Sequence, residues 1–161
     1  MYENIVENLI KSIKDFKDSN RDVVKIINQL KDVLNNVEKT LEIIECKYYE
    51  VIEKDKYNIK LLEDLIKNLE NLHNVIENVK SMILSLGANM ERNEDSLSKL
   101  EKTLEKLKDI DKEKYVLIFG EYNEAMNLIT QNKSDLRNLL EKCEVINKRM
   151  EELLTEIDNR I

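Results

Sequence analysis

The sequence predicts an all-α protein, an elongated antiparallel bundle of long coiled-coil-type helices. Apolar residues recur at alternating spacings of three and four in one register from Val6 to Leu107, which places them on one stripe of a helix. The chain of 161 residues has no proline and two glycines, so little in it interrupts a helix. Hydrophobic residues make up 42% and charged residues 37%, a composition typical of long amphipathic helices. A chain of this length is expected to form one domain, residues 1–161.

The first helix is expected to run from the start of the chain to a turn at residues 53–58. Its heptad has a positions every seven residues from Val6 and d positions every seven residues from Leu9. One a position holds a polar side chain, Asn20, without a change of register. Asp55 and Asn58 then occupy two successive core positions, and short polar side chains at such positions favour a turn.

The second helix is expected to begin after this turn and to end at residues 109–114. The first register fails there, because Asp111 and Lys114 would fall at core positions. Within this segment, Gly87 opens a polar stretch at residues 87–96. It could end a helix, since glycine is favoured just past a helix C-terminus.

The third helix is expected to begin where a second register starts four residues late. Its a positions run from Tyr115 and its d positions from Ile118. A shift of four residues is either a stutter in a continuous helix or a turn. Two layouts stay open: a hairpin of two very long helices that turns at 87–96, or three helices of roughly 50 residues each with turns at 53–58 and 109–114. A further break at 87–96 in the second layout would give four helices.

The apolar stripe is wider than the a and d positions alone. Neighbouring e and g positions also carry apolar side chains, at Val24, Ile26, Val33, Ile59, Leu61, Ile66, Val75 and Met82. Residues 115–119 are apolar on every side, so they need cover from several directions. A wide apolar face must meet more than one neighbour, which favours a multi-helix bundle formed within one chain or by dimerisation.

Charge and hydropathy disfavour several classes of partner. The net charge is −7 and the two signs are interleaved, so no basic face is expected to bind nucleic acid or an anionic membrane surface. The longest apolar run is residues 115–119, whereas a membrane-spanning helix needs about 20 apolar residues. The first residues do not resemble a secretory signal peptide. We therefore expect a cytoplasmic protein with no membrane insertion and no nucleic-acid partner.

Groups suited to catalysis or metal binding are scarce. The single histidine, His73, follows Glu70 at the Glu-x-x-His spacing of di-iron helical bundles, but such a site needs two of these motifs. His73 falls at an e position, where a polar boundary residue is the simpler explanation. The sequence has no glycine-rich phosphate loop and no nucleophile elbow. It predicts no catalytic residue, no metal site, no cofactor and no enzymatic activity.

The two cysteines occupy different heptad positions. Cys143 is at an a position and is expected to be buried, whereas Cys46 is at an f position and is expected to be more exposed. Two thiols in a cytoplasmic chain are usually reduced. A redox or intermolecular disulfide role for Cys46 is the less favoured alternative.

Candidate interaction residues come from two aromatic groups, since aromatic side chains are common at binding hot spots. They are Tyr48, Tyr49 and Tyr57 in the first group and Tyr115, Phe119 and Tyr122 in the second. Packing at the ends of a bundle is the competing explanation for both groups. Four asparagines at core positions are interpreted as register-setting residues, because a buried amide penalises wrong helix alignments. They are Asn20, Asn58, Asn93 and Asn132.

The predicted function follows from the stripe and from the shortage of catalytic groups. We expect a non-enzymatic helical-bundle or coiled-coil protein that mediates protein–protein interaction or oligomeric assembly, as an adaptor or scaffold. Its partner would be another protein, bound through helix–helix packing, or a second copy of the chain. The alternative is a cytoplasmic helical chaperone or escort for a secreted or self-assembling partner, held by packing of a helix in a groove.

Overall fold

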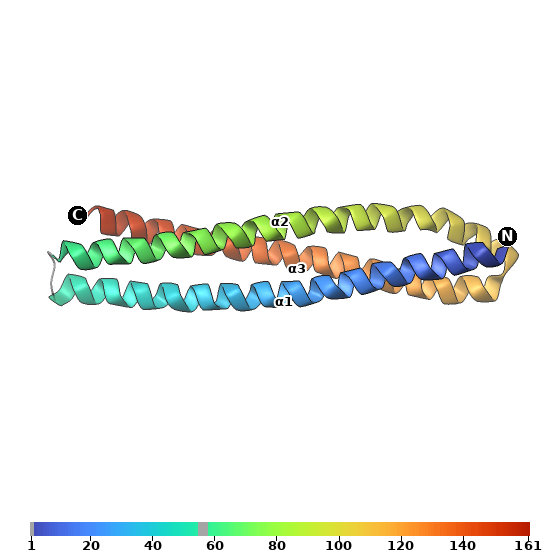
Figure 1. The fold of residues 1–161 in the computed structure, drawn as a ribbon, viewed down its shortest axis with the longest axis horizontal. Helices are drawn as coiled ribbons and strands as arrows, with labels where there is room; N and C mark the ends of the chain where they lie inside the picture. Colours follow the sequence, from blue (N-terminus) through green and yellow to red (C-terminus); the bar gives the residue numbers. More distant parts are fainter. Residues whose placement is uncertain (1, 55–57) are drawn as a thin grey trace. The chain divides into compact units, whose positions relative to one another are not determined.

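The chain folds into three long helices that pack against each other (Figure 1). The computed structural model describes residues 2–54 and 58–161. Helix α1 spans Tyr2–Lys54, α2 spans Ile59–Ile110 and α3 spans Lys112–Asp158. Among the described residues there is no strand. The all-α class is thus confirmed, and of the open layouts the structure has the one with three helices.

Helices α2 and α3 each begin after a side chain that caps them; of the turn predicted at 53–58, residues 55–57 lie outside the described residues. The Leu61 amide donates a hydrogen bond to Asn58 Oδ1 at 3.1 Å, at the start of α2. The Lys114 amide donates to Asp111 Oδ1 at 3.3 Å, at the start of α3. Asn and Asp are favoured at this position because their oxygens accept from amides that have no partner within the helix. The four-residue shift of the heptad register is therefore a turn, with Asp111 alone between α2 and α3.

Helix α2 runs without a break through residues 87–96, so the alternative turn there is not formed. Gly87 is helical and does not have a positive φ, so it does not end a helix. The heptad explains why: Met90 and Leu97 continue the a positions on both sides of the polar residues and are buried. A glycine inside a helix costs about 1 kcal/mol relative to alanine, which the burial of these two side chains outweighs.

The chain divides into two compact units, each of which contains part of all three helices. Unit 1 consists of Met1–Asn28 and Leu84–Arg137, and unit 2 consists of Gln29–Ile83 and Asn138–Ile161. No helix is interrupted at a unit boundary. The expectation of a single domain over residues 1–161 stays a prediction.

The cores of both units consist of the residues that the two heptad registers predict. In the described part of the chain, every fully buried side chain lies at an a or d position. The core of unit 1 includes Val6, Leu9, Ile13, Leu97, Leu104, Leu107, Ile118, Tyr122, Ala125 and Ile129. The core of unit 2 includes Leu30, Leu34, Leu41, Ile44, Tyr48, Leu62, Leu69, Ile76, Ile83, Cys143, Ile146, Met150 and Ile157. Each helix therefore presents one narrow stripe to its two neighbours.

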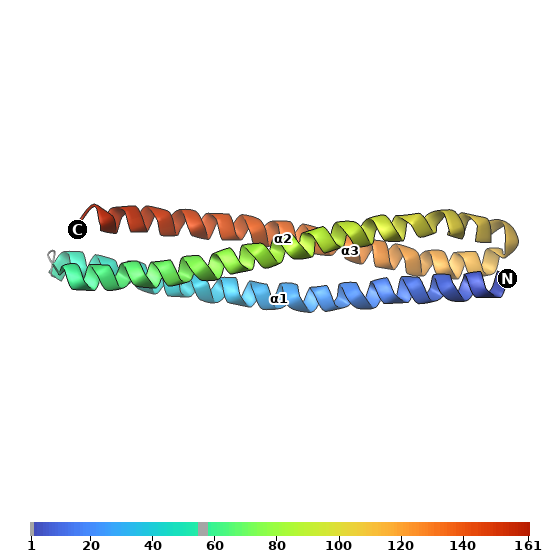
Figure 2. The same cartoon turned by 45° about the horizontal axis from the view of Figure 1, so that its top comes forward.

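The helix directions follow from contacts within each unit (Figures 1 and 2). In unit 2, Glu38 of α1 lies 2.8 Å from Lys142 of α3, and Glu45 lies 2.9 Å from Arg149, so residue numbers rise together along α1 and α3. These two helices are parallel. Helix α2, joined to α3 through Asp111 alone, runs antiparallel to both.

The predicted wide apolar face is only partly covered. Val24, Ile26 and Ile66 are half-buried, whereas Val33, Ile59, Leu61, Val75 and Met82 are exposed. The expected cover for residues 115–119 is also incomplete, because Ile118 is buried but Val116 and Leu117 are exposed. The three helices pack through their a and d side chains, so apolar side chains at the neighbouring e and g positions lie at the border of the contact and are only partly covered. Among the described residues, no helix has a stretch both long and apolar enough to span a membrane.

Candidate interaction surfaces

The histidine predicted to be a boundary residue lies on the surface of unit 2. His73 is half exposed, and its Nε2 atom lies 3.9 Å from Glu77 Oε1, one helical turn further along α2. In the part of the chain that the structure describes, no group of three or more His, Cys, Asp or Glu side chains is arranged to hold a metal ion. The Glu70–His73 spacing therefore has no second motif beside it.

The two cysteines lie as their heptad positions predict. Cys143 is fully buried in unit 2, and Cys46 is exposed on α1 of the same unit. Both are free thiols. Burial raises the pKa of the Cys143 thiol, since an apolar environment disfavours the thiolate.

The first aromatic group contains one core residue and one surface residue. Tyr48 is fully buried, whereas Tyr49 is exposed, and their ring centroids are 5.3 Å apart. Arg160, in the turn that follows α3, donates a hydrogen bond from Nε to Tyr48 Oη at 2.6 Å. Burial of the ring raises the pKa of Tyr48. Tyr57 lies outside the described residues. Of this group, Tyr49 is the side chain that a partner could reach.

The second aromatic group packs mainly inward. The rings of Tyr115 and Phe119 are stacked at 5.4 Å, and those of Phe119 and Tyr122 at 6.2 Å. Tyr122 is in the core of unit 1, and burial raises the pKa of its hydroxyl. Tyr115 and Phe119 are half-buried against that core, with the Lys108 ammonium 5.7 Å from the centroid of the Tyr115 ring. These stacked, largely buried rings agree with a packing role next to the α2–α3 turn.

Two of the four core asparagines face each other inside unit 1. Asn20 and Asn132 are fully buried, and Asn132 Nδ2 donates to the Asn20 carbonyl at 2.9 Å. Asn20 Nδ2 donates to the carbonyl of Phe16 in its own helix at 2.7 Å. The Oδ1 atoms of both amides are buried and accept no hydrogen bond from the described residues. A buried acceptor without a donor lowers the stability of the fold, so stability alone does not explain why these two core positions hold asparagine.

The other two predicted asparagines are less buried. Asn93 is half-buried and precedes Glu94, whose carboxylate accepts from Lys133, the residue after Asn132. One asparagine from each helix therefore lies at about one level of unit 1, since a helix rises only about 1.5 Å per residue. Asn58 is half-buried and caps α2 instead of lying inside a helix.

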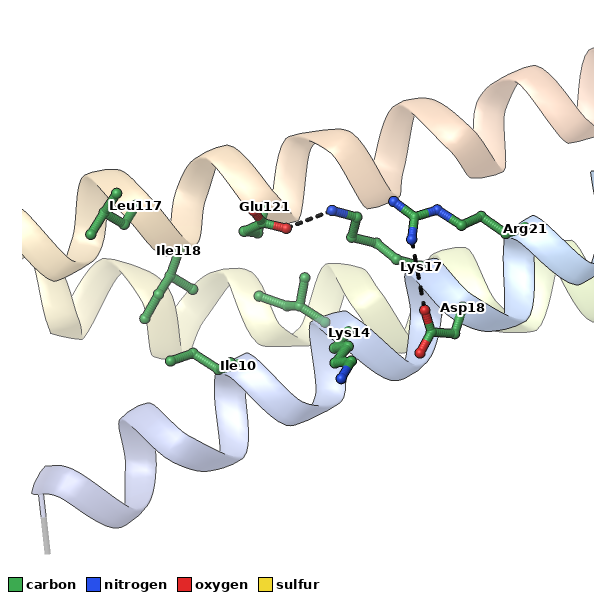
Figure 3. Close-up of a pocket in the computed structure, with 9 residues that line it drawn as sticks. Ile10, Lys14, Lys17, Asp18, Arg21, Leu117, Ile118 and Glu121 are labelled. Carbon is green, nitrogen blue, oxygen red and sulfur yellow. Dashed lines mark hydrogen bonds and ion pairs between the residues drawn. The ribbon is translucent and has the colours of Figure 1, made fainter.

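A groove in unit 1 lies between α1 and α3 (Figure 3). Its floor is apolar, formed by Ile10, Leu117 and Ile118, and Leu117 is 72% exposed. Its volume is about 430 Å³. Lys14 and Arg21 stand at the rim toward the other end of the groove (Figure 3). Asp18 and Glu121 also line the groove and pair with Arg21 and Lys17, so it combines an apolar floor with a rim of both charges.

Charged contacts between helices of unit 1 fall on two of its three edges. Lys17 Nζ lies 2.6 Å from Glu121 Oε2 and joins α1 to α3. Lys133 Nζ lies 2.8 Å from Glu94 Oε2 and joins α2 to α3. Within the described residues of α1 and α2, no ion pair or side-chain hydrogen bond links these two helices.

Unit 2 has the same distribution of polar contacts. Arg149 Nη2 lies 2.9 Å from Glu45 Oε1 and joins α1 to α3. Asn147 Nδ2 donates to Glu77 Oε1 at 3.3 Å and joins α2 to α3. In both units, α1 and α2 thus turn their e sides toward α3. The g positions lie on the other side of the a/d stripe, so those of α1 and α2 face each other.

We call this third side the α1–α2 edge and define it by its g positions. In unit 1 the edge consists of Ile5, Ser12, Ser19 and Ile26 of α1 with Asn89, Ser96, Thr103 and Ile110 of α2, none of which is charged. A groove of about 240 Å³ opens there, with Ile5 and Ser12 on one side and Leu100 and Thr103 on the other. In unit 2 the edge consists of Val33, Thr40, Lys47 and Lys54 with Leu61, Asn68, Val75 and Met82.

The sequence contained the signal for this edge, but it could not be recognised before the helix order was known. Apolar g positions such as Val33, Val75 and Met82 were identified as part of a wide stripe. Heptad spacing does not say which flank meets which neighbour. The ion pairs with α3 supply that information. They show that the charged e sides of α1 and α2 face α3, so the g positions of these two helices face each other.

The fold and these surfaces define an all-α protein of three long helices. No protein-family model matches the chain, and no solved structure matches it. The chain is similar to a curated protein of Methanocaldococcus jannaschii whose name is "Uncharacterized protein MJ0063". The two are 32% identical over 161 residues, which is 98% of this chain and 89% of that protein. The chain therefore belongs to the same family as MJ0063.

Proposed function

We propose that this protein is a non-enzymatic helical bundle that acts in the cytoplasm by coiled-coil-type helix–helix association with other protein chains, as an adaptor, scaffold or assembly subunit. The observation that supports this proposal is the α1–α2 edge of unit 2. There Val75 is 38% exposed and Met82 is 49% exposed, one heptad apart on α2, with Val33 and Leu61 also exposed on the same edge.

Helix packing would stabilise a complex at this edge. Each exposed apolar side chain contributes in proportion to the area that a partner covers, at about 25 cal/mol per Å². Val75 and Met82, one heptad apart on α2, match the spacing at which an amphipathic helix presents its anchors. The edge has few charges to desolvate, and Lys47 and Lys54 are at its end near the α1–α2 turn.

Site-specific photo-cross-linking in the native host tests the proposal. A photo-cross-linking amino acid replaces Val75 or Met82, which lie on the edge. It replaces Asn74 or Ser81 in the controls, which are exposed and one residue away on the outer face of α2. We expect protein adducts from the first two positions and few from the controls. Equal yields at all four positions, or no protein adduct at any, would contradict the proposal.

The groove between α1 and α3 of unit 1 favours a second candidate, a chaperone or escort for a helical client. Its apolar lining fits the apolar face of an amphipathic helix, and the charges of both signs at its rim can pair with the polar flank of that helix. The client would raise the melting temperature of this protein and would be insoluble alone. Leu117→Glu should abolish that stabilisation, whereas a Lys102→Glu control on α2 should not. A client that stabilises both variants equally would contradict this use of the groove.

A further inference from the structure

The α1–α2 edge of unit 1 has a charged rim of opposite sign on each side. The c positions follow the g positions outward around a helix, so they border the uncharged edge. On α1 these positions hold Asp15 and Asp22, and on α2 they hold Arg92, Lys99 and Lys106, all exposed. An uncharged seam with a shallow groove thus lies between an acidic α1 rim and a basic α2 rim.

These rim charges are available for contacts with another molecule. Asp22 lies 3.9 Å from Lys25 in its own helix, and Arg92 donates to Asn89, also in its own helix. Asp15, together with the two rim lysines, has no ion-pair partner within 4 Å among the described residues. Exposed pairs within one helix contribute little, so a second molecule could exchange them readily.

A second copy of the chain has the complementary arrangement. Rotation by 180° about an axis parallel to the helices places α1 of one copy opposite α2 of the other, at the same level. The acidic rim of each copy then meets the basic rim of its partner, on both sides of the seam. Because both series of rim charges are spaced by seven residues, one matched pair brings the next pair into register as well.

The antiparallel alternative has the opposite electrostatic result. Rotation about an axis perpendicular to the helices places α1 opposite α1 and α2 opposite α2. Asp15 and Asp22 would then face carboxylates, and the basic residues would face each other. Like charges in direct opposition repel each other, so charge selects the parallel arrangement.

We infer that the α1–α2 edge of unit 1 is a homodimer interface, where two copies of this chain associate in parallel with Asp15 and Asp22 opposite Arg92, Lys99 and Lys106. This inference rests on the proposed function and names its partner as a second copy. The groove that Ile5, Ser12 and Thr103 line would be closed by the same residues of the other copy, as a two-fold interface requires.

Charge reversal on each rim separately tests the arrangement. One variant carries Asp15→Lys and Asp22→Lys, and the other carries Arg92→Glu and Lys99→Glu, the two basic residues that lie level with these aspartates on the antiparallel helix α2. In a parallel homodimer of either variant, like charges meet on both sides, so the dimer dissociation constant should rise about tenfold or more. When the two variants are mixed, opposite charges meet on both sides, so a heterodimer should form with affinity close to that of the wild type.

The measurements use full-length chains at low salt, where screening of exposed charges is weakest. Sedimentation or light scattering at several concentrations gives the dissociation constants, and circular dichroism verifies that each variant folds. Lys102→Glu on the outer face of α2 is the matched control and should leave the dimer unchanged. Raising the salt should reduce the difference between the mixed and the separate variants.

The outcomes separate this inference from the proposed function. The parallel interface is supported if each variant alone dimerises weakly and the mixed variants form a heterodimer with affinity close to that of the wild type. A wild-type dimer that neither reversal weakens overturns it. A wild-type monomer whose edge residues cross-link to a different protein overturns it while the proposed function stands. A monomer without any cross-linked partner overturns both.

Discussion

At the scale of single residues, the buried amides of unit 1 are the least expected feature. Asn20 and Asn132 are fully buried among apolar side chains, yet each has an Oδ1 atom without a donor among the described residues. A buried polar pair of this kind weakens a core and penalises alternative alignments of the helices. The structure thus agrees with a register-setting role for these two residues, which stays a prediction.

Replacement of Asn132 with leucine should stabilise the fold and loosen its alignment. The change removes one orphan acceptor together with the hydrogen bond from Asn132 Nδ2 to the Asn20 carbonyl, and it adds an apolar side chain at a d position, while Asn20 Nδ2 keeps its bond to Phe16. We expect the free energy of unfolding to rise by about 1–2 kcal/mol. Urea unfolding measures the change, and amide NMR spectra should show broader or duplicated signals near Asn20. A destabilised variant with a single sharp set of signals would contradict the role.

At the scale of helices, the heptad pattern predicted nearly all of the packing. The a and d positions of two registers contain every fully buried side chain that the structure describes, and the failure of the first register at Asp111 located the second turn. Alternating spacings of three and four residues follow directly from helix geometry, so the buried positions of each helix can be identified in the sequence. From the sequence, Gly87 could lie at the end of a helix or inside one. The heptad register continues past it, which favours the interior of a helix.

The surfaces were less predictable, for a physical reason. Whether Val75 or Leu117 is covered depends on which helix lies beside it, and a repeat common to all three helices does not specify that. The polar contacts that decide it, such as Lys17 with Glu121, join residues about a hundred positions apart in the sequence. Among the aromatic candidates that the structure describes, Tyr48 and Tyr122 are buried and Tyr49 is exposed, and a role of these residues in binding stays a prediction.

The start of α3 should depend on its capping side chain. Asp111→Ala removes the oxygen that accepts from the Lys114 amide, and we expect a loss of about 1 kcal/mol in the free energy of unfolding. Asp111→Asn keeps an equally good cap and should change stability by only a few tenths of a kcal/mol. Chemical denaturation of the three proteins tests this. Equal losses in both variants would show that the charge, not the cap, matters.

The ion pairs between α1 and α3 in unit 1 should make stability depend on pH. Lys17 Nζ lies 2.6 Å from Glu121 and 2.7 Å from Glu124, which raises the pKa of Lys17 and lowers the pKa of Glu124. A lowered carboxyl pKa contributes stability that is lost as the pH falls, and a raised lysine pKa contributes stability that is lost as the pH rises. The contribution is therefore present between the ordinary values of 4.5 and 10.5.

Lys17→Met should reveal this window. Relative to the wild type, the variant should be less stable at neutral pH, and the difference should shrink in acid, as Glu124 protonates, and again in strong base. Lys14→Met is the control, since Lys14 is exposed and has no ion pair among the described residues, so its effect should not vary with pH. Urea unfolding across the pH range measures both. A difference that stays constant down to acid pH would show that the apolar stem of Lys17, not its charge, stabilises the contact.

At the scale of the whole molecule, the main question is whether the two units unfold together. All three helices continue from one unit into the other without a break. Helix formation is cooperative along the chain, so loss of packing in one unit removes support from helices that the other unit needs. We therefore expect one cooperative transition, as a single domain over residues 1–161 requires.

The buried thiol of unit 2 can report on damage to the core of unit 1. In a Cys46→Ser background, Cys143 is fully buried and reacts with a thiol reagent only when the core of unit 2 opens. Leu104→Ala truncates a core side chain of unit 1 and should cost about 2–5 kcal/mol. If the chain is one cooperative domain, Cys143 should react about thirtyfold faster or more, as after a matched Leu69→Ala truncation within unit 2. If Leu104→Ala lowers overall stability but leaves the labelling rate unchanged, the two units unfold independently and the chain has two domains.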